Sequence, residues 1–209
     1  MCAMIKDKIT PELKRRFLDE LRISKETGNE RGFIMCLGKK GDITASEPCI
    51  GDACTIKIED IRNACKSGKA QGDFHTHPYL KQAKEQLAET NRNIPDEKII
   101  SHMKNNIRKF YENTGVEGIT INSPSGNDLM RTLLSKYSKT SNGTVCTLSD
   151  IGDNKLECWT VQNMREDKMS IYSAKAYSDL LKTSKEDEAI LIEKWIDSIF
   201  DREIIDLDK

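Results

Sequence analysis

The sequence predicts an α/β or mixed α+β fold. Short apolar runs bounded by glycines or turn residues alternate with segments whose apolar residues recur at helical spacing. Apolar residues make up 37% of 209 residues, which is enough for one core, and no repeat or low-complexity linker divides the chain. We therefore expect residues 1–209 to form a single domain.

The first half of the chain predicts one helix followed by several strands. Leu13, Phe17 and Leu21 recur at helical spacing, which predicts a helix over residues 11–23. The run GFIMCLG at residues 32–38 lies between glycines and predicts a buried strand. The elements expected next are strands over 42–46 and 55–58, a helix over 58–66, and a strand over 70–74 that runs into His75.

The second half is richer in helix. In order, we expect helices over 80–91 and 96–113, a strand over 116–121, a helix from Ser125 through Leu134, a hairpin of strands 144–149 and 156–161, and helices over 170–181 and 186–200. Residues 79–115 are therefore predicted to form a helical insertion. Residues 165–209 are predicted to form a C-terminal helical extension.

Charge and composition exclude several classes of function. The net charge of −1 provides no basic field, so nucleic acid is an unlikely partner. No apolar stretch approaches the roughly 20 residues of a membrane span, and the N-terminus does not resemble a secretory signal. The seven cysteines are irregularly spaced without a CxxC pair, so we expect them to be mainly reduced, with Cys49 and Cys54 as the one pair that could form a bridge. A cytoplasmic protein is expected.

The segment GDFHTHP at residues 72–78 carries the strongest chemical signal. Residues i and i+2 of a strand point to the same side, so His75 and His77 can converge on one metal ion. Pro78 then ends the strand and leaves both imidazoles at its end. Spacing alone is equally compatible with two surface histidines.

Two further segments could complete a catalytic site. A catalytic zinc takes three protein ligands, and Asp128 in PSGND at residues 124–128 could be the third. The alternative is a helix capping box, with Ser125 as N-cap and Asp128 reaching back to it. Glu30, just before the apolar strand, could hold water and move its proton, although it could equally be an ordinary loop residue, and Glu26 is a more distant candidate for the same role.

The order Glu30, His-Thr-His-Pro and Ser-x-x-Asp resembles the JAMM motif of the JAB/MPN metalloenzyme family, over roughly residues 28–160. The resemblance implies a central mixed β-sheet flanked by helices, with one Zn²⁺ at the sheet edge bound by His75, His77 and Asp128. It assigns Glu30 as general base and then acid, and Ser125 as a hydrogen-bond donor to the oxyanion. The implied reaction is hydrolysis of isopeptide or peptide bonds after the C-termini of ubiquitin-like proteins, with a ubiquitin-like protein or conjugate as substrate.

Two other functions compete with this interpretation. A catalytically silent MPN-type scaffold or protein-interaction domain would share the fold, but such domains generally lack the metal ligands. Amidohydrolase and PHP-type enzymes also use His-x-His, but they need several more histidines, and only His102 remains. Since residues 78–124 separate the two motif pieces, we expect the insertion 79–115 to lie beside the site as a substrate selector or lid, unless it packs away from it.

Overall fold

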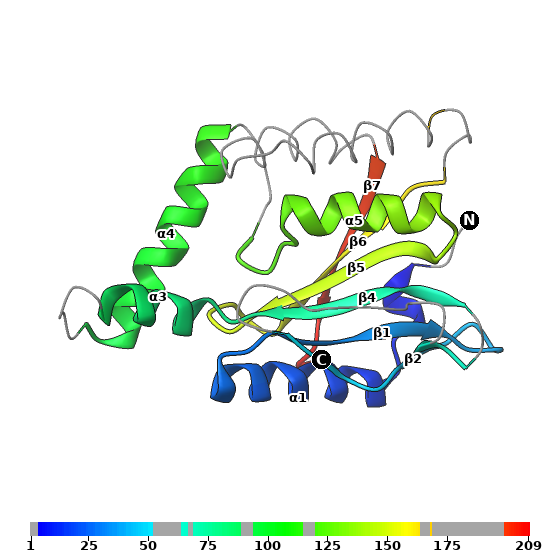
Figure 1. The fold of residues 1–209 in the computed structure, drawn as a ribbon, viewed down its shortest axis with the longest axis horizontal. Coiled ribbons are helices and arrows are strands. Elements are labelled where there is room, and N and C mark those ends of the chain that lie inside the picture. The colour runs from blue at the N-terminus through cyan, green and yellow to red at the C-terminus, as the bar shows by residue number, and fades with distance from the viewer. Residues whose placement is uncertain are drawn as a thin grey trace.

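The computed structural model describes residues 4–51, 64–66, 69–88, 94–114, 120–163, 168 and 199–209. Within these ranges the chain forms a mixed α/β structure, a seven-stranded sheet packed with four α-helices (Figure 1). The helical elements are a 3-10 helix η1 (Ile5–Lys8), α1 (Pro11–Thr27), α3 (Tyr79–Ala88), α4 (Asp96–Thr114) and α5 (Gly126–Tyr137). The strands are β1 (Arg31–Leu37), β2 (Ile43–Ala45), β3 (Cys49–Ile50), β4 (Ala70–His77), β5 (Ser141–Ser149), β6 (Lys155–Val161) and β7 (Phe200–Asp206).

The sheet is mixed because one central pair of strands is parallel. The strands lie in the order β2-β1-β4-β5-β6-β7, and β3 pairs with β1. β4 and β5 run parallel, whereas every other described pair is antiparallel. A parallel pair needs a crossover connection, and α3, α4 and α5 all lie in the chain between β4 and β5.

Most elements predicted from periodicity are confirmed. The helices expected over 11–23, 80–91 and 96–113 correspond to α1, α3 and α4, and the hairpin corresponds to β5 and β6. None of the described helices is both long enough and apolar enough to span a membrane. Local signals place these boundaries: at α1, the Thr10 hydroxyl accepts a hydrogen bond from Leu13 N, and Gly28 ends the helix at φ +68°.

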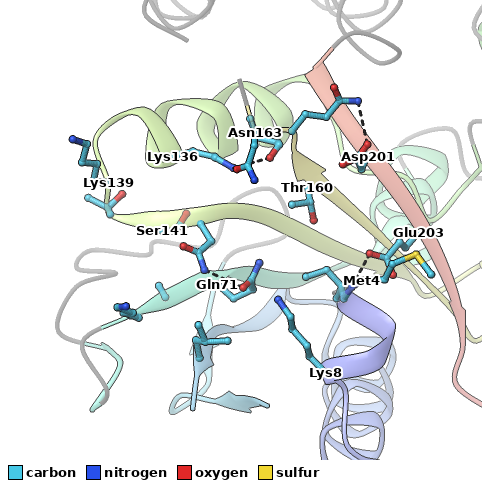
Figure 2. Close-up of a pocket in the computed structure, with 18 of the residues that line it drawn as sticks. Met4, Lys8, Gln71, Lys136, Lys139, Ser141, Thr160, Asn163, Asp201 and Glu203 are labelled. Carbon is cyan, nitrogen blue, oxygen red and sulfur yellow. Dashed lines mark hydrogen bonds between the residues drawn. The ribbon is translucent and has the colours of Figure 1, made fainter. Parts of the chain in front are cut away.

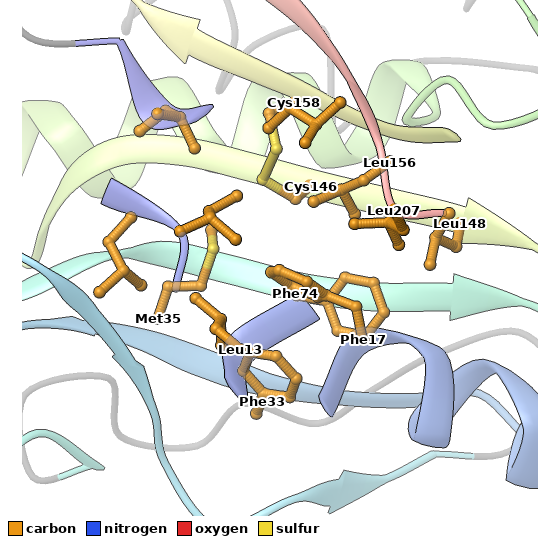
Figure 3. Packing of buried hydrophobic residues seen from close by; sticks show 14 of the residues in the cluster. Leu13, Phe17, Phe33, Met35, Phe74, Cys146, Leu148, Leu156, Cys158 and Leu207 are labelled. Carbon is orange, nitrogen blue, oxygen red and sulfur yellow. A yellow bond between two sulfur atoms is a disulfide. The ribbon is translucent and has the colours of Figure 1, made fainter. Parts of the chain in front are cut away.

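One face of the sheet is covered by α1 and holds the main apolar core (Figure 3). Phe33 on β1 lies directly opposite Phe74 on β4, and Phe17 of α1 packs on both, with ring centroids 5.3 and 4.7 Å away. All three rings are fully buried. Because a slip of one residue would turn these rings to the other face, this cluster fixes the register of β1 on β4.

The opposite face is covered by α5 (Figure 1). Its buried residues Leu129, Met130 and Leu133 face the sheet, where Val145 of β5 and Trp159 of β6 are also buried. The residues of β4 that alternate with Phe74 therefore point toward the side of α5. His75 and His77 are among them.

The end of the chain corrects one prediction. Residues 165–209 were expected to be a helical extension, and a helix was expected to run to Phe200, but residues 200–206 form β7. β7 pairs antiparallel with β6 over seven residues and buries Ile205 in the core cluster. This pairing is non-local, so a helical apolar spacing before residue 200 did not reveal it.

Other predicted elements lie mainly outside the described residues. These are the strand over 55–58, most of the helix over 58–66, most of the strand over 116–121, and the helices over 170–181 and 186–200. Of the strand expected over 116–121, only Thr120 and Ile121 are described, and neither is in a strand.

The cysteines correct a second prediction. Cys36 pairs with Cys65, and Cys146 pairs with Cys158 directly across β5 and β6, where the Cα atoms are 4.1 Å apart. Cys49 is free, and burial raises the pKa of its thiol. Mainly reduced cysteines were expected from the irregular spacing, which does not reveal the pairing of Cys146 with Cys158 because that pairing depends on strand register. Cys49 is not in a bridge, and Cys54, its expected partner, lies outside the described residues. Disulfides are typical of oxidising compartments, so the cysteines no longer support the prediction of a cytoplasmic location.

Candidate metal centre

Two histidines project side by side from the end of β4. His75 lies opposite Gly32 of β1 on one side and Thr147 of β5 on the other. His77 follows two residues later on the same face, opposite Ser149 of β5. Both imidazoles are buried, and their ring centroids are 5.1 Å apart. The strand periodicity therefore places two metal-binding side chains together at the carboxyl end of a central strand.

Asp128 reaches the histidines from the first turn of α5. Its carboxylate Oδ2 lies 3.3 Å from His75 Nε2 and 3.7 Å from His77 Nε2. One potential ligand atom from each of these three residues lies within 4.8 Å of the others, so the group could hold a metal ion. The structure thus brings together the three residues predicted as ligands, although 50 residues lie between His77 and Asp128 in the sequence. Of these, residues 89–93 and 115–119 are not described.

The spacing of the three ligand atoms fits a small divalent cation. Metal–ligand bonds of about 2 Å in a tetrahedron place the ligand atoms about 3.3 Å apart. The observed Nε2–Oδ2 distances of 3.3 and 3.7 Å are close to that edge length. Two imidazoles and one carboxylate are a donor set that zinc accepts, and three protein ligands leave a fourth position open.

Burial and charge act in opposite directions in this group. Burial alone would lower the pKa of His75, but the carboxylates of Asp128 and Asp73 outweigh it and hold that pKa well above its usual range. Burial likewise would raise the pKa of Asp128, but the nearby histidines hold it well below its usual range. For His77, burial lowers the pKa, and the charge on His75 adds to the effect. A metal ligand must offer a free lone pair, so a cation bound at His75 Nε2 would compete with a proton at that nitrogen.

Ser125 forms the N-cap of α5 and is fully engaged with Asp128. Its hydroxyl donates to Asp128 Oδ2 at 2.7 Å and accepts from Asp128 N at 3.3 Å, and Ser125 N donates to the same Oδ2 at 2.8 Å. The capping box proposed as the alternative is therefore present. It also has a consequence for the site, because it fixes the carboxylate of Asp128 toward the histidines.

Buried polar contacts anchor the loop that leads to Ser125. Asn122 Nδ2 donates to Asp153 O at 3.1 Å and to Lys155 O at 2.9 Å, both in or beside the β5–β6 turn. The hydroxyl of Thr147, next to His75 on the sheet, donates to Asn122 O. The start of α5 is thereby tied to the strands that carry the site.

A second buried carboxylate, Glu157 on β6, completes this anchor. It accepts from Ser123 Oγ at 2.7 Å, Thr120 Oγ1 at 2.7 Å and Trp159 Nε1 at 2.8 Å, and it pairs with Arg202 of β7 at 2.8 Å. With four partners already in place, this carboxylate is best explained as structural support for the loop.

Glu30 lies at the mouth of β1 and is buried. Glu30 comes just before β1, whose residue Gly32 pairs with His75 of β4. Glu30 lies outside the group of three potential ligands. The alternative, Glu26, is exposed on α1, which covers the other face, and pairs with Arg22 at 2.9 Å.

Two neighbours of the histidines were not anticipated. Asp73 Oδ2 lies 3.2 Å from His75 Nδ1, and Tyr79 Oη lies 3.0 Å from His77 Nδ1. The same i, i+2 spacing that singled out the histidines extends back along β4 to Asp73 and could have predicted that contact. Tyr79 follows Pro78 as the first residue of α3, so strand spacing does not predict its contact.

The remaining candidates in the described chain lie elsewhere. His102 is exposed on α4, where Asn106 Nδ2 lies 2.9 Å from its Nε2. A cavity of about 870 Å³ lies at the other end of the sheet, where β4 and β5 begin (Figure 2). Among the described residues that line it there is no histidine or cysteine. Its polar residues largely bond to one another, as Asn142 does to Gln71 at 3.1 Å.

Comparison of the chain with protein-family models, with curated proteins and with solved structures found no match in any of the three. The function is therefore inferred from the residues and their geometry.

Proposed function

We propose that this protein is a zinc-dependent hydrolase of the JAMM type, which cleaves isopeptide or peptide bonds after the C-termini of ubiquitin-like proteins. The observation that carries the proposal is the approach of Asp128 to both His75 and His77, at 3.3 and 3.7 Å, from a separate element of the fold. The motif order in the sequence, which resembles the JAMM pattern, adds the substrate class. We also propose a cytoplasmic location, and the proposed ubiquitin-like substrate is the reason for it, because the cysteines no longer support it.

The three ligands and Glu30 divide the work in this proposal. When bound, zinc would polarise the scissile carbonyl as a Lewis acid and lower the pKa of water toward about 7. His75, His77 and Asp128 would hold the ion and leave one position open for exchange. Glu30, which is buried just before β1 and lies outside the ligand group, would accept a proton from water and deliver it to the leaving amine.

Ser125 has a more demanding role in the proposal. As oxyanion donor it must turn its hydroxyl toward the substrate, but that hydroxyl now donates to Asp128 Oδ2. Since Ser125 N donates to the same oxygen, Asp128 would keep one of its two bonds to Ser125 if the hydroxyl rotated. The backbone bond thus provides the means for the serine to act in catalysis without releasing the ligand.

The proposal is tested with a ubiquitin-like protein fused to a reporter and with a branched conjugate of the same protein. We expect cleavage after the C-terminal residue, loss of cleavage on chelation and recovery with Zn²⁺. Glu30→Gln should retain zinc but lose turnover by about 10²–10⁴-fold, the usual contribution of general acid–base catalysis.

Glu26→Gln is the matched control, because it makes the same change on the exposed side of α1. It should cleave at the wild-type rate. Cleavage that survives chelation, or wild-type turnover in Glu30→Gln, would contradict the mechanism. Bound zinc without cleavage of either substrate would contradict the proposed reaction.

A further inference from the structure

The two nitrogens of each site histidine face different partners. Nε2 of His75 and Nε2 of His77 both point to Asp128 Oδ2. The Nδ1 atoms point away from it, to Asp73 Oδ2 at 3.2 Å and to Tyr79 Oη at 3.0 Å. Each imidazole is therefore held at both ends, with its outer nitrogen engaged by a residue that does not belong to the ligand group.

These outer partners are themselves fixed by the fold. Asp73 lies within β4, between Ile34 of β1 and Val145 of β5 in register. Tyr79 is the first residue of α3, and its backbone N donates to Asp150 Oδ1 at 2.9 Å while Leu80 N donates to Oδ2 at 3.0 Å. Asp150 thus caps α3 from the end of β5 and holds Tyr79 against His77, with ring centroids 5.2 Å apart.

We infer that Asp73 and Tyr79 are positioning residues of the metal site, each fixing one ligand histidine with its proton on Nδ1 and the Nε2 lone pair toward the ion. The inference rests on the metal site of the proposed function. A carboxylate can only accept, so Nδ1 of His75 must donate to Asp73. A phenol oxygen can accept as well as donate, so Tyr79 Oη can accept a hydrogen bond from Nδ1–H of His77 when Nε2 binds metal.

The two contacts differ in charge, and so should their effects. Asp73 adds a negative charge beside the site, and together with Asp128 it balances the two positive charges of a zinc ion. It also increases the electron density that His75 offers through Nε2. Tyr79 is neutral, so it orients His77 without adding charge. Loss of Asp73 should therefore weaken metal binding more than loss of the Tyr79 hydroxyl.

The test is zinc affinity, measured on the metal-free full-length chain by competition with a chromophoric chelator. Asp73→Asn keeps an acceptor oxygen but removes the charge, and Asp73→Ala removes both. We expect the zinc Kd to rise by about 10-fold to 100-fold across this series, the usual cost of losing such an outer contact. Tyr79→Phe should raise Kd by less than Asp73→Ala does.

Matched controls and a second readout separate positioning from a general loss of structure. Asp96→Asn and Tyr137→Phe make the same changes at exposed positions and should leave Kd unchanged. The unfolding temperature of the metal-free variants should match the wild type. The visible spectrum of bound Co²⁺ should shift in the Asp73 variants, because a reoriented imidazole changes the ligand field.

The outcomes distinguish this inference from the proposed function. A wild-type Kd in Asp73→Ala and Tyr79→Phe would overturn the inference and leave the ligands and the hydrolase proposal in place. A wild-type chain without zinc affinity would overturn both. Weakened zinc binding in the variants of a wild type that cleaves neither substrate would overturn the hydrolase proposal alone.

Discussion

The two faces of β4 have opposite tasks, although their residues alternate along one strand. Phe74 points to α1 and packs with Phe17 and Phe33, whereas His75, one residue later, points to Asp128 on α5. The α1 face has a continuous apolar cluster, and the α5 face at this end has a charged group held by hydrogen bonds. The apolar face therefore fixes the register that places the histidines, and the polar face can change its chemistry without changing the fold.

The largest effect should follow from breaking the apolar face. Phe74→Ala removes a fully buried ring that touches two others and should lower the free energy of unfolding by about 3–5 kcal/mol. His77→Ala, measured without metal, should cost less than about 1.5 kcal/mol, because it removes hydrogen-bonding groups rather than core volume. Denaturant unfolding checks both. Equal losses in the two variants would contradict the division between the faces.

The Cys146–Cys158 bridge should come next, since it joins two strands within the apolar cluster. Replacing both cysteines with alanine should lower the free energy of unfolding by about 2–4 kcal/mol. Cys49→Ala, at a free and half-buried thiol, serves as control and should change it by about 0.5 kcal/mol or less. The two described bridges take four of the seven cysteines, so at most three thiols should react under denaturing, non-reducing conditions. Seven reactive thiols would reject both bridges.

Zinc should stabilise the folded chain through the site on the polar face alone. At a free zinc concentration of 100 times Kd, the wild type should gain about 2.7 kcal/mol in unfolding free energy, because zinc binds the folded chain. The gain should vanish in His77→Ala and persist in the double variant of Cys146 and Cys158, which alters the other face. Thermal unfolding with and without zinc checks this. A zinc-dependent gain in His77→Ala would place the binding site elsewhere.

The smallest expected effect concerns α3, which begins directly after the site, and α4, which follows it in the chain. Replacing residues 80–114 with a short Gly/Ser linker retains Tyr79 and should leave zinc stoichiometry unchanged, since closing a loop of this size adds little free energy. We expect the relative rates on linear and branched substrates to change by about tenfold, or about 1.4 kcal/mol. Unchanged rates on both substrates would reject the insertion as a substrate selector.

The elements that the sequence predicted are those with strong local signals. α1 has helical apolar spacing, an N-cap at Thr10 and a glycine end at Gly28, so its sequence alone determines it. β7 has no such signal, because it depends on pairing with β6 far away in the chain. The disulfides were missed for the same reason, since only the strand register brings Cys146 opposite Cys158.

The site shows the same limit on a smaller scale. Strand periodicity placed His75 and His77 on one face, and the motif order suggested Asp128, which the structure brings to them. The same periodicity, extended two residues back from His75 along β4, would have added Asp73. The hold of Ser125 on Asp128 through two hydrogen bonds could be anticipated as a capping box, but not its direction toward the histidines.

Metal content per chain decides whether His75, His77 and Asp128 hold one zinc ion. Inductively coupled plasma mass spectrometry on the purified, zinc-equilibrated chain should give about one zinc per wild-type chain. Glu30→Gln should give the same value, because Glu30 lies outside the ligand group. His77→Ala and Asp128→Ala should give a value near zero. Zinc-free wild type, or full zinc occupancy in His77→Ala, would contradict the assignment of these three residues as zinc ligands.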